Sequence, residues 1–560
     1  MKRLEKLFPF VGWRPSKEVL RSDFVAGLTV ALVLIPQSMA YAQLAGLPVV
    51  VGLYASFLPV ILGALWGSSH HLQTGPVAMT SLLTATALIP LATPETAEYV
   101  ALAGVLAVLL GVIRLLIGFF RLTVVANFLS KPVMDGFIHA GVLVIASSQI
   151  SKLFGLQMPR SDWYLRDLWN LLLDLPQTNL ICLALGVGSV LMLVLLKRFA
   201  PKVPAALCVV MAMTMLVYLF GLSDGARITH PIRVVGNIPL GLPSLAAVKL
   251  DWGVLLKMLP GALAITFIGF MEMCGVAKAV AAKSKQSLNL DQEMIGQGVA
   301  ALASGFSGGY PISGSFSRTA LNYSAGGKSG FSSVFTGLFV ALFLMFMAGT
   351  LYYLPTAALG AIIIVAVLGL LNFPQLFSYW KISRMEGFAA LFTFIATLCF
   401  APQLQNGILA GAALSIFFYL FSAMKPNVSL LARYEDGTWR EASTAGFPPD
   451  PVFPVLRFDG RLFFANTSYF ETALLDVQEK YPQARYIAVD ASGINAIDAS
   501  GVDMLGKLAQ ELADGDGVKL FLCGVKPAVR QILKKSNVLS QIGEENFFFR
   551  LDDAKAFSLG

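Results

Sequence analysis

Residues 73–91 read QTGPVAMTSLLTATALIPL, and residues 313–323 read SGSFSRTALNY. Both are largely apolar stretches that open on small or turn-forming residues: Gly75 and Pro76 in the first, Gly314 between two serines in the second. A helix needs about 20 mostly apolar residues to span a bilayer. Each stretch is therefore either shorter than a spanning helix or interrupted by turn-forming residues. The rest of the sequence is needed to interpret them.

The whole chain is unusually apolar. Of its 560 residues, 56% are hydrophobic and 13% are charged, whereas a soluble domain carries about 25% charged residues. Charged residues are sparse from Phe24 to Met424 and reach an ordinary density from Lys425 onward. We therefore divide the chain into a cytosolic N-terminal segment (1–23), a transmembrane transport domain (24–424), a linker (425–450) and a soluble domain (451–560).

Reading for runs of spanning length gives fourteen segments, including the two quoted above. They are 24–42, 49–67, 73–91, 98–120, 125–150, 177–197, 203–221, 253–277, 292–306, 315–323, 331–350, 356–371, 386–401 and 405–424. Lys and Arg collect in cytosolic loops of membrane proteins. Here they are frequent in the N-terminal segment and follow the fourth, sixth, eighth, twelfth and fourteenth segments. This parity favours fourteen crossings of the inner (plasma) membrane, with both termini in the cytosol.

Fourteen segments divide into two repeats of seven, and an odd repeat length inverts the second copy. The third and tenth segments, which are the two opening stretches, are then counterparts. Paired, interrupted segments in the two halves of a transporter point to its binding site. Alternatively, their small residues only permit close helix packing. The matched pair favours the binding site.

The residues of these two segments suit an anion. Two helix starts aimed at one point offer unpaired N–H groups and partial positive charge. Small residues such as Ala78 let a ligand approach the backbone, and Ser315 and Ser317 add hydroxyl donors. A cation inside a membrane is functional by default, so we expect Arg318 to attract or pair with the anion. The alternative is an arginine that snorkels to the membrane surface or forms a structural ion pair with an acidic residue.

Glu272 lies within the apolar run ALAITFIGFMEMCGV (262–276). An isolated carboxylate is costly there, so it must be paired, solvated or protonated. We expect a role in proton coupling or gating; the alternative is a structural partner for Arg318 or a lysine. Gln37 and Tyr41 lie one helical turn apart and share a face, so we expect both to line the cavity.

Other polar residues give weaker indications of a functional role. Asp135 and His139 are also one turn apart, and a salt bridge is favoured over a coupled proton pair. His70 and His71 lie in a short loop without further metal ligands, and the five cysteines show no CxxC spacing. We therefore expect no metal site and no cofactor.

The tail alternates strands and helices, which predicts an α/β domain whose sheet is covered by helices. We expect strands at 451–458, 460–466, 485–493 and 519–525, and helices at 467–481, 499–514 and 527–536.

Three stretches of the chain resemble a known family. These are LIPQSMAYAQLAGLPVVVGLYASFLPVILGALWGSSHHLQTGPVAMTSLL (34–83), FIGFMEMCGVAK (267–278) and GQGVAALASGFSGGYPISGSFSRTALNYSAGGKSG (296–330). They are similar to the signatures of the sulfate permease (SulP) family of anion transporters, in which a membrane domain precedes a STAS tail. The resemblance covers essentially the whole chain.

This resemblance implies an α-helical polytopic membrane protein whose fourteen transmembrane segments form a 7+7 inverted repeat of core and gate subdomains. It also implies a cytosolic α/β STAS domain and a homodimer in the lipid bilayer. The membrane carboxylate of the family falls on Glu272 and is associated with coupling to a cation or proton. The anion would lie between the third and tenth segments, near Gln37, Tyr41, Val77, Ala78, Ser315, Phe316, Ser317 and Arg318.

The STAS resemblance rests on Asp498-Ala499-Ser500-Gly501 at the start of a helix. In stand-alone relatives the matching serine is phosphorylated, which makes Ser500 a candidate regulatory site. A phosphate at a helix N-terminus is electrostatically favourable. Alternatively, Asp498 and Ser500 are ordinary helix caps.

We therefore expect secondary active transport of a small inorganic anion, foremost proton-coupled sulfate uptake. The alternatives are sodium-coupled bicarbonate or dicarboxylate transport, an anion exchanger or channel-like conductor, and a nucleobase permease of the same fold. An enzyme is not expected, because no nucleophile is paired with a base and no phosphate-binding Walker loop occurs. The net charge of +8 does not indicate nucleic-acid binding, because no basic face with interleaved aromatic residues accompanies it.

Overall fold

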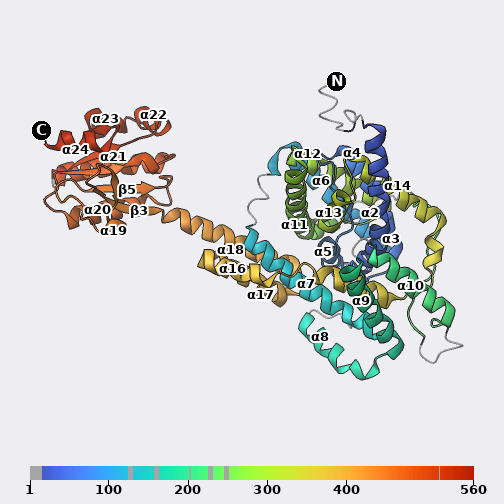
Figure 1. Ribbon diagram of the computed structural model, residues 1–560. Helices are drawn as coiled ribbons and strands as arrows, with labels where there is room; N and C mark the ends of the chain where they lie inside the picture. Colours follow the sequence, from blue (N-terminus) through green and yellow to red (C-terminus); the bar gives the residue numbers. More distant parts are fainter. Residues whose placement is uncertain are drawn as a thin grey trace. The chain divides into compact units, whose positions relative to one another are not determined.

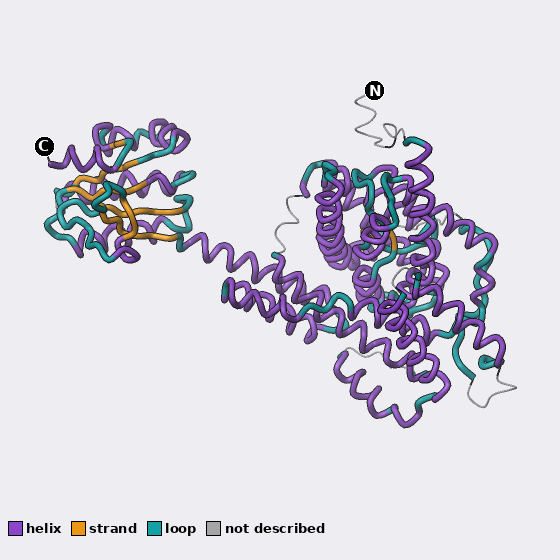
Figure 2. The backbone as a smooth tube through the Cα atoms, in the orientation of Figure 1, coloured by secondary structure: helices purple, strands orange, loops and turns teal. Residues whose placement is uncertain are grey.

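The computed structural model describes residues 10, 15–123, 130–156, 163–200, 203–224, 231–244, 251–515 and 517–559. The chain forms two compact units, Met1–Ser415 and Ile416–Gly560. The first is almost entirely helical, and the second contains a six-stranded sheet (Figure 2). The expected segment at 125–150 begins outside the described residues.

Each of the fourteen predicted segments contains a helix (Figure 1). In chain order these are α2 (Lys17–Leu44), α3 (Val49–Tyr54) with α4 (Leu58–Trp66), α5 (Ala78–Leu88), α6 (Ala97–Phe119), α7 (Lys131–Phe154), α9 (Leu180–Phe199), α10 (Ala205–Phe220), α11 (Trp252–Ser284), α12 (Leu290–Phe306), α13 (Phe316–Ser324), α14 (Phe331–Phe346), α15 (Thr356–Leu368), α17 (Arg384–Phe400) and α18 (Leu404–Met424). The described part of the helical unit also contains α8 (Tyr164–Leu173) and α16 (Phe373–Ile382), which were not expected. Within the described residues, eight spans are long and apolar enough to cross a membrane, so the count of fourteen crossings stays a prediction.

The close helix packing falls into two groups. One contains α2, α3, α4, α5, α6, α11, α12, α13 and α14, and the other contains α7, α9, α10, α15, α16 and α17; α2 also packs on α15 and α10 and so joins the two groups. Contacts recur in pairs, as an internal repeat requires: α6 packs on α12 and α11, while its counterpart α14 packs on α4 and α2. Figure 1 shows α7 beside α16 and α17 in the second group. The helical fold with two subdomains is therefore the one expected.

Glycine allows a tight crossing between α6 and α12. A Cβ on Gly111 would lie 2.9 Å from the carbonyl oxygen of Gly298, and one on Gly305 would lie 2.7 Å from that of Gly104. Such distances admit no side chain, so the two backbones pack directly against each other. In a bilayer, where helix association gains little from the hydrophobic effect, small residues at a crossing supply this packing.

The second unit is an α/β domain. Its sheet has the order β4-β3-β5-β6-β7-β8; β3 runs antiparallel to β4 and β5, and the remaining pairs are parallel. Successive strand residues face opposite sides: Leu520 and Leu522 join one apolar cluster, and Phe521 and Cys523 the other. The elements are β3 (Asn427–Arg433), β4 (Trp439–Glu441), α19 (Ala442–Ala445), β5 (Val455–Asp459), α20 (Thr467–Lys480), β6 (Tyr486–Asp490), α21 (Ala499–Gly515), β7 (Lys519–Cys523), α22 (Pro527–Lys535), α23 (Val538–Ile542), β8 (Phe547–Phe548) and α24 (Leu551–Leu559).

Two predictions for this unit are corrected. The expected strand at 460–466 is reduced to a single bridge between Leu462 and Ile497, because α20 begins soon after it. The expected linker at 425–450 contains β3 and β4, and β3 pairs with β5 from Asn427↔Asp459 to Leu431↔Val455. The sheet therefore begins almost directly after α18.

Candidate functional site

The candidate site is built around two very short strands. β1 (Thr74–Gly75) and β2 (Ser313–Gly314) pair antiparallel, with Thr74 opposite Gly314 and Gly75 opposite Ser313. Helices α5 and α13 begin within three residues of them, at Ala78 and Phe316. The pairing therefore brings the N-termini of the third and tenth segments together, as the sequence predicted.

Polar side chains fix these strands in place. The backbone N–H of Ser315 donates to the carbonyl oxygen of Gln73 at 2.9 Å, and the N–H of Gln73 donates to the Thr319 hydroxyl at 3.0 Å. From α12, the amide of Gln297 donates to the hydroxyl of Thr74 at 2.7 Å. The backbone leading into both helix starts is thus held by buried hydrogen bonds, which makes it a rigid platform.

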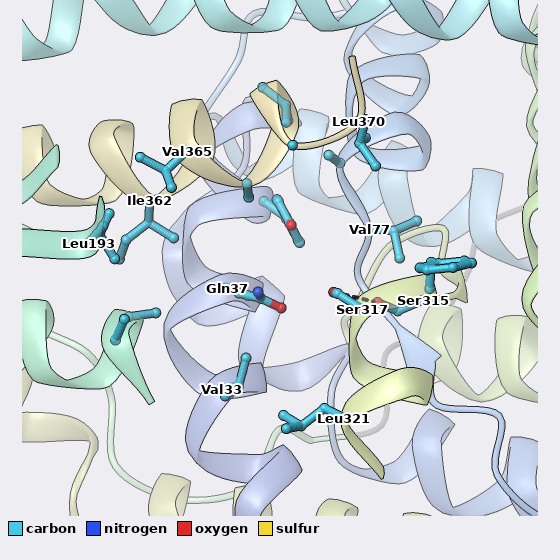
Figure 3. A pocket seen from close by; sticks show the side chains of 18 of the residues that line it. Val33, Gln37, Val77, Leu193, Ser315, Ser317, Leu321, Ile362, Val365 and Leu370 are labelled. Carbon is cyan, nitrogen blue, oxygen red and sulfur yellow. Dashed lines mark hydrogen bonds between the residues drawn. The ribbon is translucent and has the colours of Figure 1, made fainter. Parts of the chain in front are cut away.

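A cavity of about 1040 Å³ lies in front of the two helix starts. Figure 3 shows Gln37 of α2 pointing toward Ser317 of α13, with Ile362 and Val365 of α15 in another part of the wall. Eight of the nine residues expected near the anion or in coupling line it: Gln37, Tyr41, Val77, Ala78, Glu272, Ser315, Phe316 and Ser317.

Arg318 is the exception, since it does not line the cavity. It is buried (1% exposed), and its Nη1 reaches the Oε1 of Gln37 at 3.5 Å, a weak hydrogen bond. Its Nε and Nη2 have no hydrogen-bond partner, and Nη2 lies close to Gly75, where an added Cβ would be 3.2 Å away. The guanidinium therefore lies behind the cavity wall, between β1 and α2, and keeps unpaired donors there.

Glu272 lines the same cavity from α11. Among the described residues, no lysine or arginine forms an ion pair with it, and no hydrogen bond to its carboxylate is found. The structural alternative, a pair with Arg318 or a lysine, is therefore not observed. A carboxylate that faces a cavity without a partner is free to bind a proton or a cation.

Sequence reasoning missed Arg114 and Tyr310. Arg114 of α6 is 1% exposed, and its Nη1 donates to the carbonyl oxygen of Ile312, next to β2, at 2.7 Å. The hydroxyl of Tyr310, which is fully buried, lies 2.9 Å from that of Ser81 on α5. Arg114 could have been found as the charge within the apolar run 98–120, but Tyr310 carries no comparable signal.

The expected salt bridge between Asp135 and His139 is not formed. The Nδ1 of His139 lies 2.6 Å from the backbone oxygen of Asp135, and its Nε2 accepts from the N–H of Asn372 at 2.8 Å. The Asp135 carboxylate instead accepts from the hydroxyl of Tyr379. The imidazole therefore joins α7 to the segment between α15 and α16.

At the start of α21, Asp498 is the helix cap. Its carboxylate accepts from the N–H of Gly501 at 2.9 Å and from that of Phe464 at 3.0 Å. Ser500 is exposed, and its hydroxyl makes no hydrogen bond within the described residues. Ser500 thus lies accessible at a helix N-terminus without serving as the cap.

Comparison with known proteins identifies the family. The sequence model of the sulfate permease family matches residues 20–393, and that of the STAS domain matches residues 448–554. The chain belongs to the sulfate permease family. Membership makes this sulfate permease a multi-pass membrane transporter of anions rather than an enzyme.

Individual relatives extend over nearly the whole permease. It is 33% identical to a probable sulfate transporter of Mycobacterium tuberculosis, over 97% of both chains. It is 30% identical to the chloroplastic sulfate transporter 4.1 of Arabidopsis thaliana, over 98% of this chain and 82% of that protein. Its fold matches the murine anion transporter Slc26a9 in the inward-facing state with a TM-score of 0.90 and 25% identity, over 100% of this chain and 95% of that one.

Within the described residues, no three His, Cys, Asp or Glu side chains gather closely enough to hold a metal ion.

Proposed function

We propose that this permease takes up sulfate together with protons. The observation that carries the proposal is the convergence of two helix starts and two serine hydroxyls on a cavity that also contains an unpaired carboxylate, Glu272. Helix N-termini and hydroxyls stabilise an oxyanion without requiring a full charge. Glu272 then carries the proton that enters with it.

The sulfate would lie between α5 and α13, near Gln37, Val77, Ala78, Ser315 and Ser317. Tyr41 and Phe316 would bound it from α2 and α13. Arg318 would act from behind the wall, because its unpaired N–H groups and its charge in a low-dielectric setting attract an anion even without direct contact.

The lining of the cavity away from the two helix starts indicates on which side of the membrane the cavity opens. Its lining continues to Lys197 at the end of α9 and to Pro204 before α10, a basic loop expected on the cytosolic side. We infer that this conformation faces the cytosol, in a plasma-membrane protein with both termini inside the cell. We further propose a homodimer, regulated by its STAS domain through modification of Ser500.

Uptake of labelled sulfate into proteoliposomes tests the function. We expect accumulation when the outside is more acidic than the lumen, and none when only a sodium gradient is imposed. Bicarbonate and succinate as competitors then rank the other candidate anions. Sulfate uptake that is indifferent to the proton gradient would rule out proton symport.

The coupling residue has its own test. Glu272→Gln should abolish gradient-driven accumulation but leave sulfate binding within about twofold, because an amide keeps the size of the side chain but cannot take up the proton. Glu98→Gln, at an exposed carboxylate in the first turn of α6, is the matched control and should accumulate sulfate normally. Full accumulation by Glu272→Gln would show that coupling lies elsewhere.

A further inference from the structure

A second, smaller pocket of about 410 Å³ lies among three loops of the helical unit. One loop joins α4 to β1, another joins α11 to α12, and the third joins α13 to α14. The pocket is lined by His70, His71, Ser284, Gln286, Tyr323, Gly326, Gly327 and Lys328. It shares no lining residue with the cavity described above.

The lining supplies hydrogen-bond donors and no carboxylate. Lys328 brings an ammonium group that, among the described residues, makes no ion pair or hydrogen bond. The nearby carboxylate of Asp23 is already used: it accepts from the backbone N–H of Lys328 at 2.6 Å and from that of Ser329 at 3.1 Å. The lining thus contains the positive charge of Lys328 and no carboxylate, while the hydrogen-bonded carboxylate of Asp23 lies near enough to act electrostatically on both imidazoles.

His71 gives a second, independent sign of a ligand. The residue is 5% exposed, and its Nδ1 is buried without a hydrogen-bond partner. The edge of its ring faces Tyr323, with the ring centroids 5.4 Å apart. A buried polar atom without a partner is costly, and each one in a folded protein calls for an explanation. The hydroxyl of a protonated oxyanion would satisfy Nδ1 of a neutral ring, and a bare oxyanion oxygen would satisfy it when the ring is protonated.

We propose that this pocket binds a small oxyanion, separately from the transport cavity. Lys328 provides the charge, and Tyr323, Ser284 and the two imidazoles provide hydrogen bonds. A protonated imidazole donates to any oxyanion, and a neutral one accepts from an oxyanion that carries a proton. A metal ion fits less well, because two histidines without a carboxylate or thiolate leave its coordination incomplete.

The occupant would contact the backbone that supports the transport site. The carbonyl oxygen of His71 accepts from the Asn322 side chain at 2.9 Å, and that of Leu72 accepts from the Ser333 hydroxyl at 3.3 Å. Thr74, the first residue of β1, follows two positions later. An anion held by His71 and Lys328 would therefore link this segment to the loop before α14. The anion is either the transported one or free inorganic phosphate.

Protection from chemical modification tests the proposal on the full-length protein. Diethyl pyrocarbonate modifies imidazoles, and mass spectrometry of the peptide containing His70 and His71 reports its extent. We expect sulfate, inorganic phosphate or both to slow the modification at constant ionic strength. Protection by sulfate alone would identify the transported anion as the occupant, and protection by phosphate alone would identify free phosphate. No protection by either anion at millimolar concentration would overturn the proposal.

Two matched variants separate this pocket from the transport cavity. In Lys328→Gln, the anion concentration that halves the rate of imidazole modification should rise about fivefold or more, as expected for the loss of a charge-assisted contact. Lys283→Gln, on the exposed last turn of α11 and outside the pocket lining, should behave as the unmodified protein. Equal protection of all three proteins would place the effect at the transport cavity and refute the second site.

Hydrogen exchange supplies a readout that does not depend on imidazole chemistry. Bound anion should slow amide exchange in the peptide spanning residues 67–75, and this slowing should be absent in Lys328→Gln. Slowing that persists in Lys328→Gln would contradict the assignment of Lys328.

Discussion

Some charged side chains near the large cavity line it, and others are buried in the protein behind it. Glu272 faces the cavity, whereas Arg318 and Arg114 lie in the protein behind it and make one hydrogen bond each. A guanidinium that remains charged in such a setting raises the local potential for an anion. We therefore expect the two arginines to act on affinity and Glu272 to act on coupling.

Arg318→Gln should raise the KM for sulfate about tenfold, which corresponds to about 1.4 kcal/mol. The reason is that it removes a buried positive charge, which attracts the anion from behind the cavity wall. Initial uptake rates over a range of sulfate concentrations measure it. Arg384→Gln, at the exposed start of α17, is the control and should leave KM unchanged. An unchanged KM in Arg318→Gln would reduce this arginine to a structural role.

Arg114→Met should weaken sulfate binding by about fivefold, because the carbonyl oxygen of Ile312 then loses its buried donor at a cost of about 1 kcal/mol. The backbone before β2 is loosened as a result. Arg114→Lys keeps the charge and part of the hydrogen bonding. Its affinity for sulfate should therefore lie between those of the unmodified protein and Arg114→Met. Binding that is equally strong in all three would remove Arg114 from the site.

At the scale of elements, the sequence predicts the helices well and their contacts less well. Apolar length is a local property, so a helix lies in each of the fourteen expected segments, although α8 and α16 were not expected. The register of β1 against β2 depends on residues from two repeats, and no local pattern contains it. The direction of the Arg318 side chain could not be read either, because Ser315, Ser317 and Arg318 lie on one turn and only packing decides which of them faces the cavity.

Helix packing within the second group depends on close backbone contact at Gly136 of α7. A Cβ at this position would lie 2.2 Å from the carbonyl oxygen of Ala390 on α17. Gly136→Ala should therefore push α7 and α17 apart and destabilise the protein by about 3 kcal/mol. Thermal unfolding of the detergent-solubilised protein measures this as a lower melting temperature.

Gly188→Ala on α9 is the matched control. Its nearest neighbour would be the Cε of Met213 at 3.9 Å, so the added methyl group fits. We expect a melting temperature at or slightly above that of the unmodified protein, since alanine favours a helix over glycine. Equal melting temperatures for the two variants would contradict the packing argument.

At the scale of the whole molecule, the change in composition near residue 425 located the soluble domain, but its first strands escaped sequence reasoning. β4 has three residues, and β3 follows α18 after two. Asp436-Gly437 between them is a dipeptide typical of a hairpin turn, so the sequence carried a signal for both strands that was not used. The sheet was recognised from β5 onward because strands and amphipathic helices alternate there.

The C-terminal unit should lose stability in acid through Asp450. Partial burial opposes the charged carboxylate, but the ammonium of Lys555 at 2.7 Å and the N–H of Val452 outweigh this and hold the pKa of Asp450 below its ordinary value. A lowered pKa stabilises the fold above about pH 4, and this contribution disappears as the pH falls through the folded-state value. Asp450→Asn should thus cost about 1 kcal/mol at pH 7 and nothing near pH 2.

Urea unfolding of residues 425–560 at several pH values measures this difference. Asp503→Asn is the control, because Asp503 pairs with Lys507 fully at the surface and such pairs contribute little. A stability difference for Asp450→Asn that does not change with pH would rule out the carboxylate as its source.

The pairing of Thr74 with Gly314 joins positions 240 residues apart in the chain. Contacts of such long sequence separation form late in folding, because a large loop must close before they are made. During synthesis, the first repeat therefore enters the bilayer without the strand that pairs with β1. A chain interrupted before α13 would contain α5 but not its counterpart, so the site that we propose cannot form until synthesis has passed Ser324.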